Sequence, residues 1–165
     1  MKDNLFSVII TTHNSKNYVD KTIKSVINQN FNDYEIILVD DCSKDGTVEL
    51  VKKNYKNKIK IFSTKKNFGG PAKSRNIGIN KSKGDWISFL DGDDYWFQNR
   101  LSHFSKLILS NPECEVFCSN EITVNKIYKS KKIINHGPYT PNFFEDLLLR
   151  GNRLSPSATI IKKKF

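Results

Sequence analysis

Apolar residues in this chain follow two alternating patterns. Unbroken apolar runs, such as Ile36 to Val39, are typical of β-strands covered on both faces, whereas apolar residues three or four apart are typical of amphipathic helices. The unbroken runs predict strands at residues 6–12, 35–39, 59–62 and 86–90. The spaced residues predict helices at Val19 to Asn30, Val48 to Tyr55 and Leu101 to Ile108, and Pro71 predicts the start of another helix between them. This alternation favours an α/β fold with a parallel or mixed sheet covered by helices.

The predicted helix starts carry capping signals. Asn14 or Ser15 is placed to cap the first helix, and Ser43 or Asp45 to cap the second. Pro71 stands at the start of the third helix, where a missing backbone N–H is tolerated. These residues therefore mark where each strand-to-helix loop is expected to end.

Beyond residue 112 the pattern is looser. It predicts short strands at 116–118, 122–127 and 133–134, a helix through Phe143, Phe144, Leu147 and Leu148, and a last strand at 158–161. With 165 residues and 38% apolar content, the chain is long enough for one domain, residues 1–165, with a sizeable core.

Polar residues gather where the predicted strands end. A sheet of this kind binds ligands at the carboxyl ends of its strands. Four strand ends are polar and turn-forming: Thr11 to Asn14, Asp40 to Thr47, Asn67 to Gly70, and Asp91 to Asp94. The last contains three carboxylates in four residues, whose mutual repulsion a hard cation offsets. It predicts a divalent cation completed by phosphate oxygens of a nucleotide diphosphate; the alternative is a turn whose Asp side chains accept from local backbone N–H groups.

Two further features suit a nucleotide. Gly69 and Gly70 allow close backbone approach, and the helix from Pro71 presents its positive end to a phosphate, with Lys73 and Arg75 adding charge. The carboxylate of Asp41, at the end of the second strand, is suited to accept the imide hydrogen of uracil. The alternative for the glycine segment is a plain turn with surface cations.

Four segments, in this order and spacing, resemble the inverting nucleotide-sugar glycosyltransferases of family two. Ser7 to Asn14 is similar to the first strand and loop of that family, and Val39 to Thr47 to its second-strand signature. Asn67 to Gly78 is similar to its segment with an arginine and an asparagine, and Asp91-Gly92-Asp93 to its Asp-x-Asp motif. The resemblance implies the GT-A fold, a Rossmann-like, mixed and mostly parallel sheet flanked by helices.

The resemblance also implies roles for individual residues. Asp93 would bind the metal, Mn²⁺ or Mg²⁺, directly, with Asp91 near the ribose or the metal and Asp94 extending the acidic cluster. The remaining nucleotide-binding residues would be Thr11 and His13 against the base, Asp41 on uracil, and Arg75 on the nucleotide side. The implied donor is a nucleotide diphosphate-sugar, with UDP expected, and the implied acceptor is a saccharide or a lipid-linked glycan in surface glycan biosynthesis.

Inverting transfer also needs a carboxylate base that takes a proton from the acceptor hydroxyl. In the family this base follows a segment similar to Ser155 to Phe165, so we expect it beyond Phe165; no carboxylate follows Asp146. Glu121, Glu145 and Asp146 have no context that supports them as substitutes. The alternative function is therefore a non-catalytic nucleotide-sugar-binding module, or an inactive fragment without the base.

The chain is basic, with 27 Lys and Arg against 17 Asp and Glu and a formal charge of +10. The densest runs are Lys129 to Lys132 and Lys162 to Lys164, which predict a solvated surface or peripheral contact with an anionic membrane. A nucleic-acid-binding domain and a nucleotidyltransferase remain rivals, but no nucleic-acid partner is expected. With no apolar stretch of membrane-spanning length and no signal-peptide pattern, the expected location is cytoplasmic, with peripheral contact at the inner membrane face.

Overall fold

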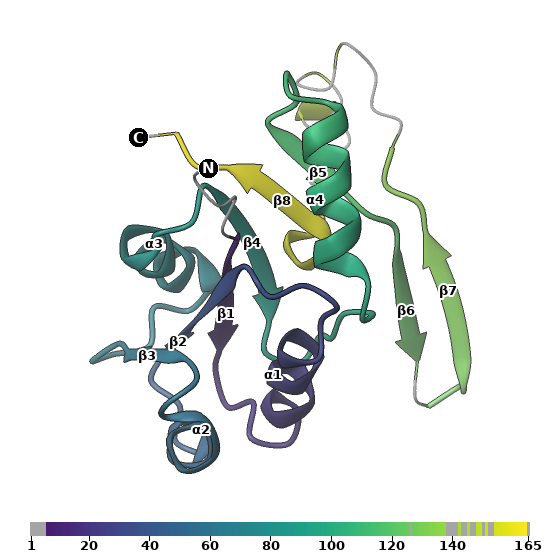
Figure 1. Ribbon diagram of the computed structural model, residues 1–165. Coiled ribbons are helices and arrows are strands. Elements are labelled where there is room, and N and C mark those ends of the chain that lie inside the picture. Colours follow the sequence, from purple (N-terminus) through teal and green to yellow (C-terminus); the bar gives the residue numbers. More distant parts are fainter. Residues whose placement is uncertain are drawn as a thin grey trace.

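The computed structural model describes residues 6–125, 127–137 and 154–164, together with residues 142, 145, 148, 149 and 151. Its centre is a mixed six-stranded sheet with the order β3-β2-β1-β4-β8-β5 (Figure 1). The strands are β1 (Phe6–Thr12), β2 (Tyr34–Asp40), β3 (Lys60–Ser63), β4 (Trp86–Asp91), β5 (Val116–Cys118) and β8 (Thr159–Lys162). The first four strands are parallel, and β8 runs antiparallel to β4 and β5. The expected mixed, mostly parallel sheet is confirmed.

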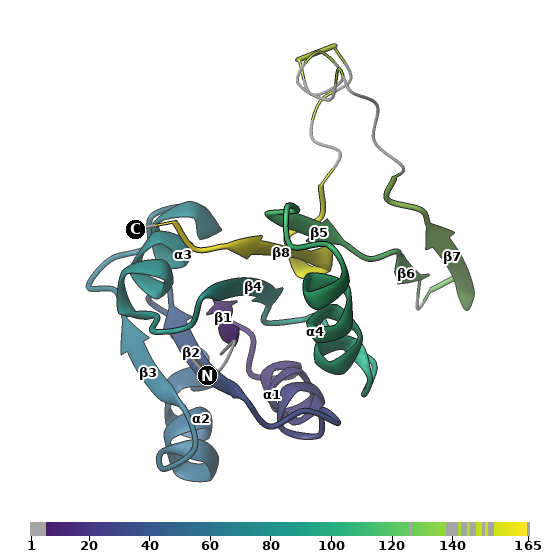
Figure 2. The same cartoon turned by 45° about the horizontal axis from the view of Figure 1, so that its top comes forward.

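Helices cover both faces of this sheet. They are α1 (Val19–Ile27), α2 (Thr47–Tyr55), α3 (Pro71–Lys81) and α4 (Arg100–Ser110), followed by a 3₁₀ turn, η1 (Pro156–Ala158). Figure 2 shows α1 and α2 on one face and α3 on the other. Within the described segments, no helix has the length and apolar composition needed to cross a bilayer.

The core follows from the alternation of side chains along β1. Phe6, Val8 and Ile10 are fully buried in one cluster with the apolar faces of α1 and α4. Ile9 points to the opposite face, where a Cβ on Gly78 of α3 would lie only 2.4 Å from its Cγ2. Glycine at position 78 therefore lets α3 pack directly on β1, which fixes the start of α3 relative to the carboxyl end of that strand.

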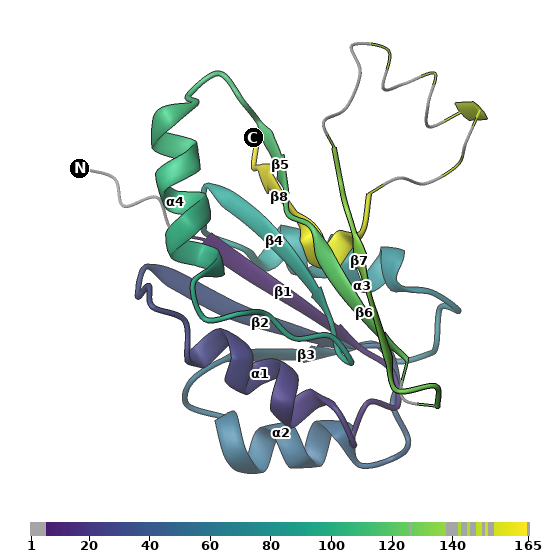
Figure 3. The ribbon, with the colours of Figure 1, turned by 90° about the vertical axis from the view of Figure 1, so that its right-hand side faces the viewer.

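A hairpin of β6 (Glu121–Asn125) and β7 (Ser130–Ile134) forms a separate two-stranded sheet. It stands away from the main sheet on the side of α4 (Figures 1 and 3). The short strands expected at residues 122–127 and 133–134 are thus present. The first ends earlier than expected, at Asn125, and the second begins earlier, at Ser130. The expected helix at residues 143–148 falls mostly outside the described residues.

The capping predictions were wrong for three residues. The residues at the N-cap positions of α1 and α2 are Tyr18 and Gly46, and neither makes a side-chain capping bond. Instead, Asn14 Oδ1 accepts from the backbone N–H of Lys44, and the N–H of Ser15 donates to Thr47 Oγ1. The hydroxyl of Ser43 donates to Asp40, while Asp45 Oδ1 does accept from the N–H of Thr47, the first residue of α2. The polar residues after β1 and β2 therefore join the two loops to each other.

Candidate functional site

The candidate site lies where the order of the strands reverses. From β1 the chain proceeds to β2 and β3 on one side, whereas β4 pairs with β1 on the other side. The loops after β1 and β4 leave the sheet in different directions at such a point, and a crevice opens between them. In the register of the sheet, Thr11 pairs with Asp91 and Thr12 with Asp40. The acidic turn after β4 and the polar loop after β1 are neighbours for this reason.

A cavity of about 420 Å³ occupies this crevice, within the roughly 300–1,000 Å³ of small-molecule sites. Its lining combines the four polar strand ends: Thr11, Thr12, His13, Ser15, Asp41, Asn67, Gly69, Gly70, Pro71, Ser74, Asp91, Gly92 and Asp93. Five of the six predicted nucleotide and metal residues are among them, and the sixth, Arg75, is not. The predicted side chains therefore meet at one place, although their roles are still predictions.

Arg75 reaches the site through Asp91. Its Nη2 donates to Asp91 Oδ1 at 2.7 Å, and the hydroxyl of Thr11 donates to the same oxygen at 3.1 Å. The Arg75 side chain is 19% exposed and that of Asp91 35% exposed. Neither bond uses Oδ2 of Asp91, which keeps its lone pairs for a ligand. Arg75 is thus placed to orient Asp91 rather than to line the cavity.

The turn after β4 requires glycine between the two aspartates. A Cβ at Gly92 would lie 2.7 Å from Thr12 Cγ2 and 3.0 Å from the carbonyl oxygen of Thr11. The N–H of Gly92 donates to that carbonyl, and its own carbonyl accepts from Thr22 Oγ1 of α1 at 2.9 Å. The close contact between backbones holds Asp91 and Asp93 against the end of β1.

Asp93 is the carboxylate of this turn that has no protein partner. Its side chain is exposed, and it makes no hydrogen bond or ion pair within the part of the chain that the structure describes. Partial burial, together with the charges of Asp93, Asp91 and Glu121, raises the pKa of Asp94, against a lowering hydrogen bond from Ser157. Negative charge is therefore crowded at the turn, and a cation would relieve it.

The residues present fit a metal that is shared with a ligand. Among the described residues, no three His, Cys, Asp or Glu side chains are grouped so as to hold a metal ion alone. Mg²⁺ and similar ions are commonly held by one or two carboxylates and completed by substrate phosphates. Asp93, with the free oxygen of Asp91, supplies such a half-site.

The ring of His13 is held in one tautomer by three neighbours. Its Nδ1 lies 2.6 Å from the carbonyl oxygen of Asp41, so this nitrogen carries the proton. Its Nε2 accepts from the side-chain amides of Asn14 at 3.1 Å and Asn67 at 3.2 Å. The ring is consequently a fixed wall of the cavity rather than a mobile loop side chain.

Asp41 is 5% exposed; it lines the cavity and also accepts hydrogen bonds from the loop before α3. Its Oδ1 accepts from the hydroxyl of Thr64 at 2.9 Å, and its Oδ2 accepts from the backbone N–H of Phe68 at 3.1 Å. Each carboxylate oxygen has two lone pairs, so one further donor can be accommodated. The glycine-containing loop before α3 is thereby attached to the end of β2.

Three residues of the site were not singled out from the sequence. Ser74 is 1% exposed, and its hydroxyl has no hydrogen-bond partner in the described chain although it lines the cavity. Asn67 holds His13, as described above. Ser157, in η1, accepts from the N–H of Asp91 at 3.1 Å. Its position depends on β8 pairing with β4, a contact between distant segments that no local pattern announces.

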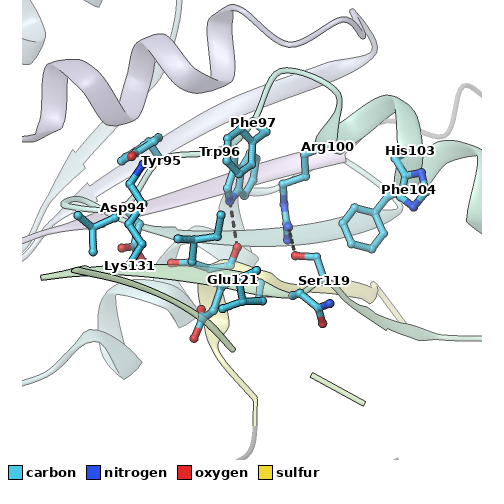
Figure 4. A pocket seen from close by; sticks show the side chains of 16 residues that line it. Asp94, Tyr95, Trp96, Phe97, Arg100, His103, Phe104, Ser119, Glu121 and Lys131 are labelled. Atoms are coloured by element: carbon cyan, nitrogen blue, oxygen red, sulfur yellow. Dashed lines mark hydrogen bonds between the residues drawn. The ribbon is translucent and has the colours of Figure 1, made fainter. Parts of the chain in front are cut away.

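A second, larger cavity of about 580 Å³ lies on the other side of the acidic turn (Figure 4). Asp94 and Ser157 line it. Its aromatic walls are Tyr95, Trp96 and Phe97 after β4 and Phe104 of α4, and its aliphatic wall is the hairpin residues Ile122, Val124 and Ile133. The acidic turn thus separates a polar cavity from a mostly apolar one.

Arg100 braces the wall of this second cavity. Its guanidinium carbon lies 4.7 Å from the ring centre of Trp96 and 4.8 Å from that of Phe104, and its Nη1 donates to Ser119 Oγ at 2.5 Å. Loss of solvent on burial lowers the pKa of Arg100 to about 10, which still leaves the side chain charged at neutral pH. The cation therefore ties α4 to the segment that leads into β6.

Comparison with known proteins gives close relatives. TarS of Staphylococcus aureus, a poly(ribitol-phosphate) beta-N-acetylglucosaminyltransferase, is 40% identical over 94 residues, which are 54% of this chain and 16% of TarS. WfaP of Escherichia coli, a UDP-Glc:alpha-D-GlcNAc-diphosphoundecaprenol beta-1,3-glucosyltransferase, is 33% identical over 143 residues, 81% of this chain and 54% of WfaP.

The crystal structure of S. aureus TarS 1–349 in complex with UDP-GlcNAc superimposes with a TM-score of 0.77 and 28% identity. The match covers 95% of this chain and 45% of that chain, so the present chain spans about half of that structure. The fold is accordingly GT-A. The model of the family described as Glycosyl transferase family 2 matches residues 7–163. The chain belongs to glycosyl transferase family 2.

Proposed function

We propose that this protein is a metal-dependent glycosyltransferase that transfers a sugar, with inversion, from a UDP-sugar to a saccharide or lipid-linked glycan. One observation carries the proposal: Asp41, Asp91 and Asp93 line a single cavity at the point where the strand order reverses. Relatives named for the transfer of N-acetylglucosamine and glucose support a sugar nucleotide as the donor.

The cavity offers a distinct environment to each part of UDP. Asp41 and the fixed ring of His13 would hold the uracil. The spare oxygen of Asp91 has two lone pairs, so it would accept from the ribose with one and leave the other for the metal. The backbone of Gly69 and Gly70 and the start of α3 would approach the diphosphate, since a helix N-terminus presents free N–H groups and positive potential. Ser74 adds a buried hydroxyl on the same side.

Asp93, with Asp91, would hold Mn²⁺ or Mg²⁺ against the diphosphate oxygens. The bound cation would stabilise the negative charge that develops on the leaving nucleotide diphosphate. Arg75 contributes by keeping Oδ1 of Asp91 engaged at 2.7 Å, so that the remaining oxygen has a defined direction.

The second cavity is the proposed place for the acceptor. Inversion requires attack from the face of the sugar opposite the leaving group, and this cavity lies across the acidic turn from the nucleotide cavity. Its aromatic walls suit the apolar faces of sugar rings.

Two measurements test this function. Isothermal titration calorimetry with UDP and MnCl₂ should show binding that disappears when the metal is chelated, and no binding would contradict the proposal. Incubation with UDP-GlcNAc or UDP-glucose and Mn²⁺ then separates the alternatives. Release of UDP supports a transferase, and binding without release identifies a non-catalytic module. A parallel incubation with UTP and a sugar 1-phosphate tests for a nucleotidyltransferase, which would release pyrophosphate.

A further inference from the structure

The hairpin of β6 and β7 ends in two large apolar side chains next to lysines. Ile127 and Tyr128, in its turn, are 85% and 79% exposed. Lys129, Lys131 and Lys132 follow, and all three are exposed. We propose that this hairpin tip, residues 127–132, docks the protein on an anionic membrane surface.

The fold itself does not explain the two apolar side chains. Neither belongs to the buried core cluster, and β6 and β7 pair with each other rather than with the main sheet. Val124 and Ile133 face the second cavity, which accounts for the apolar residues lower on the hairpin. Neighbouring exposed apolar residues on a surface indicate a partner outside the molecule.

The backbone of the turn is suited to a medium with little water. Asn125 Oδ1 accepts from the backbone N–H groups of Ile127 at 3.0 Å and Tyr128 at 3.1 Å. An amide N–H that enters an apolar environment without a partner is unfavourable, and here both are satisfied within the turn. These two N–H groups therefore keep their partner when Ile127 and Tyr128 enter the headgroup region.

The charge of the hairpin favours an anionic bilayer over another protein surface. Its residues 121–134 carry several lysines and one carboxylate, Glu121, which lies at the far end of β6 and 3.3 Å from His136 Nε2. Long lysine side chains reach lipid headgroups while a neighbouring apolar residue enters the acyl boundary, and tyrosine is enriched at that depth. The tip combines both features within six residues.

The direction of the hairpin also agrees with docking. In Figures 1 and 3, β6 runs in the same general direction as β1 and β4, so its tip extends toward the end of the molecule that holds the acidic turn. If the proposed function is right, docking brings the acceptor cavity near an acceptor anchored in lipid. The membrane contact itself does not depend on that function.

Vesicle sedimentation tests the contact without any nucleotide. The whole chain should sediment with vesicles of phosphatidylglycerol and phosphatidylcholine at moderate salt, and far less with phosphatidylcholine alone. Ile127→Ser with Tyr128→Ser should lower the partition coefficient at least about tenfold. Lys129→Gln with Lys132→Gln should lower it about 25-fold, because each lysine near anionic lipid contributes about fivefold.

Matched controls change the same residue types elsewhere. Leu109→Ser removes an apolar residue of α4 that is 69% exposed, and Lys52→Gln with Lys53→Gln removes two exposed charges of α2. Both should leave partitioning within about twofold of the parent, since each lysine matters only near the lipid. Equal losses in tip and control variants would show general charge attraction and overturn the proposal, as would no vesicle binding by the parent.

Fluorescence of a tryptophan introduced at the tip measures insertion into the bilayer directly. Trp86 and Trp96 are 4% and 8% exposed, so brominated lipids should hardly quench the parent fluorescence. Tyr128→Trp should add emission that these lipids quench. Unquenched emission, or a dimer in sedimentation velocity that the tip substitutions abolish, would mean that the tip does not enter lipid and the proposal is wrong.

Discussion

Asp93 and Asp91 stand two residues apart but differ in their partners. Oδ1 of Asp91 is taken by Arg75 and Thr11, whereas Asp93 has no such bonds in the described chain. A carboxylate that is already oriented by a cation is suited to position a ribose, and an unpaired one is suited to a metal. The two aspartates of the motif are therefore expected to respond differently to substitution.

Asp93→Asn should weaken Mn²⁺-dependent UDP binding by at least about tenfold, equivalent to about 1.4 kcal/mol, because the neutral amide is a poorer ligand for the cation. Calorimetry with UDP and MnCl₂ measures the effect. Asp85→Asn, just before the other end of β4, is the control and should bind like the parent. If the Asp93 variant binds UDP and Mn²⁺ as tightly as the parent, Asp93 is not a metal ligand.

Asp41→Asn should weaken binding of UDP more than that of ADP or CDP, since uracil presents an imide hydrogen to this carboxylate whereas adenine and cytosine have a ring nitrogen without hydrogen at the equivalent edge. Competition calorimetry with the three nucleotides measures the selectivity. Thr64→Val is the control, because it removes the hydroxyl that donates to Asp41 Oδ1 but keeps the carboxylate. Its effect on binding therefore measures the contribution of loop structure without loss of the base contact. A uniform loss for all three nucleotides would assign Asp41 to the loop instead of the base.

Gly92→Ala should destabilise the protein by about 1–3 kcal/mol, because its methyl group would meet Thr12 Cγ2 at 2.7 Å and the Thr11 carbonyl at 3.0 Å. Urea unfolding measures the loss. Adding Thr12→Ser removes the methyl contact and keeps the hydroxyl that bonds Asp40, so the double variant should recover part of the stability. No recovery would place the conflict at the backbone only.

At the residue scale, the sequence predicted which side chains gather but not how they are bonded. Asp91 and Asp93 stand in a recognisable turn, and Asp41 follows an apolar run, so local pattern located them. The pairing of Arg75 with Asp91 and the contact of Ser157 with the Asp91 N–H join residues far apart along the chain. Such bonds depend on packing of α3 and β8 on the sheet, which local pattern does not contain.

At the scale of elements, most strands and helices of the first 110 residues were predictable because they lie in a clear apolar repeat. The exception is α3, whose repeat is weak and whose start was indicated by Pro71. The starts of α1 and α2 were not predictable. Asn14 and Ser43 have the residue types of caps but join the two loops instead, and the hydroxyl of Ser15 donates to the carbonyl of His13. A side-chain cap contributes only about 1 kcal/mol to stability. Hydrogen bonds to other parts of the loops outweigh this contribution at these residues.

A clamp at the amino ends of the strands gives a prediction at this scale. Glu35 of β2 accepts from Ser7 Oγ at 2.7 Å and from the N–H of Lys83, and pairs with Lys60 of β3 at 2.6 Å. Burial alone would raise the pKa of Glu35, but these hydrogen bonds and the Lys60 charge lower it below its ordinary value of 4.5. The charged carboxylate therefore joins three strand segments.

Glu35→Gln should cost about 1–3 kcal/mol of unfolding free energy at pH 7. Because the folded-state pKa is depressed, the parent's advantage is full above the ordinary value and is lost as pH falls below about 4.5 through the folded-state pKa. Urea unfolding from pH 3 to 7 measures this difference, with the exposed Glu49→Gln as control. A difference that does not shrink in acid would contradict the assignment.

At the scale of the whole molecule, the acidic turn divides two cavities of different character. The polar cavity joins the ends of β1, β2 and β4, and the mostly apolar one is walled by α4 and the hairpin. The sequence indicated the first, because four strand ends share polar residues. It did not indicate the second, because its walls come from segments with loose apolar patterning that acquire a common face only when the hairpin forms.

The central claim is that this chain holds a sugar nucleotide and a divalent cation at the end of β4. The most direct measurement is a crystal structure with UDP and Mn²⁺, with the metal located by its anomalous signal. The account predicts a manganese peak bonded to Asp93 and the diphosphate, with uracil against Asp41. Manganese away from the acidic turn, or UDP outside the cavity between β1 and β4, would contradict it.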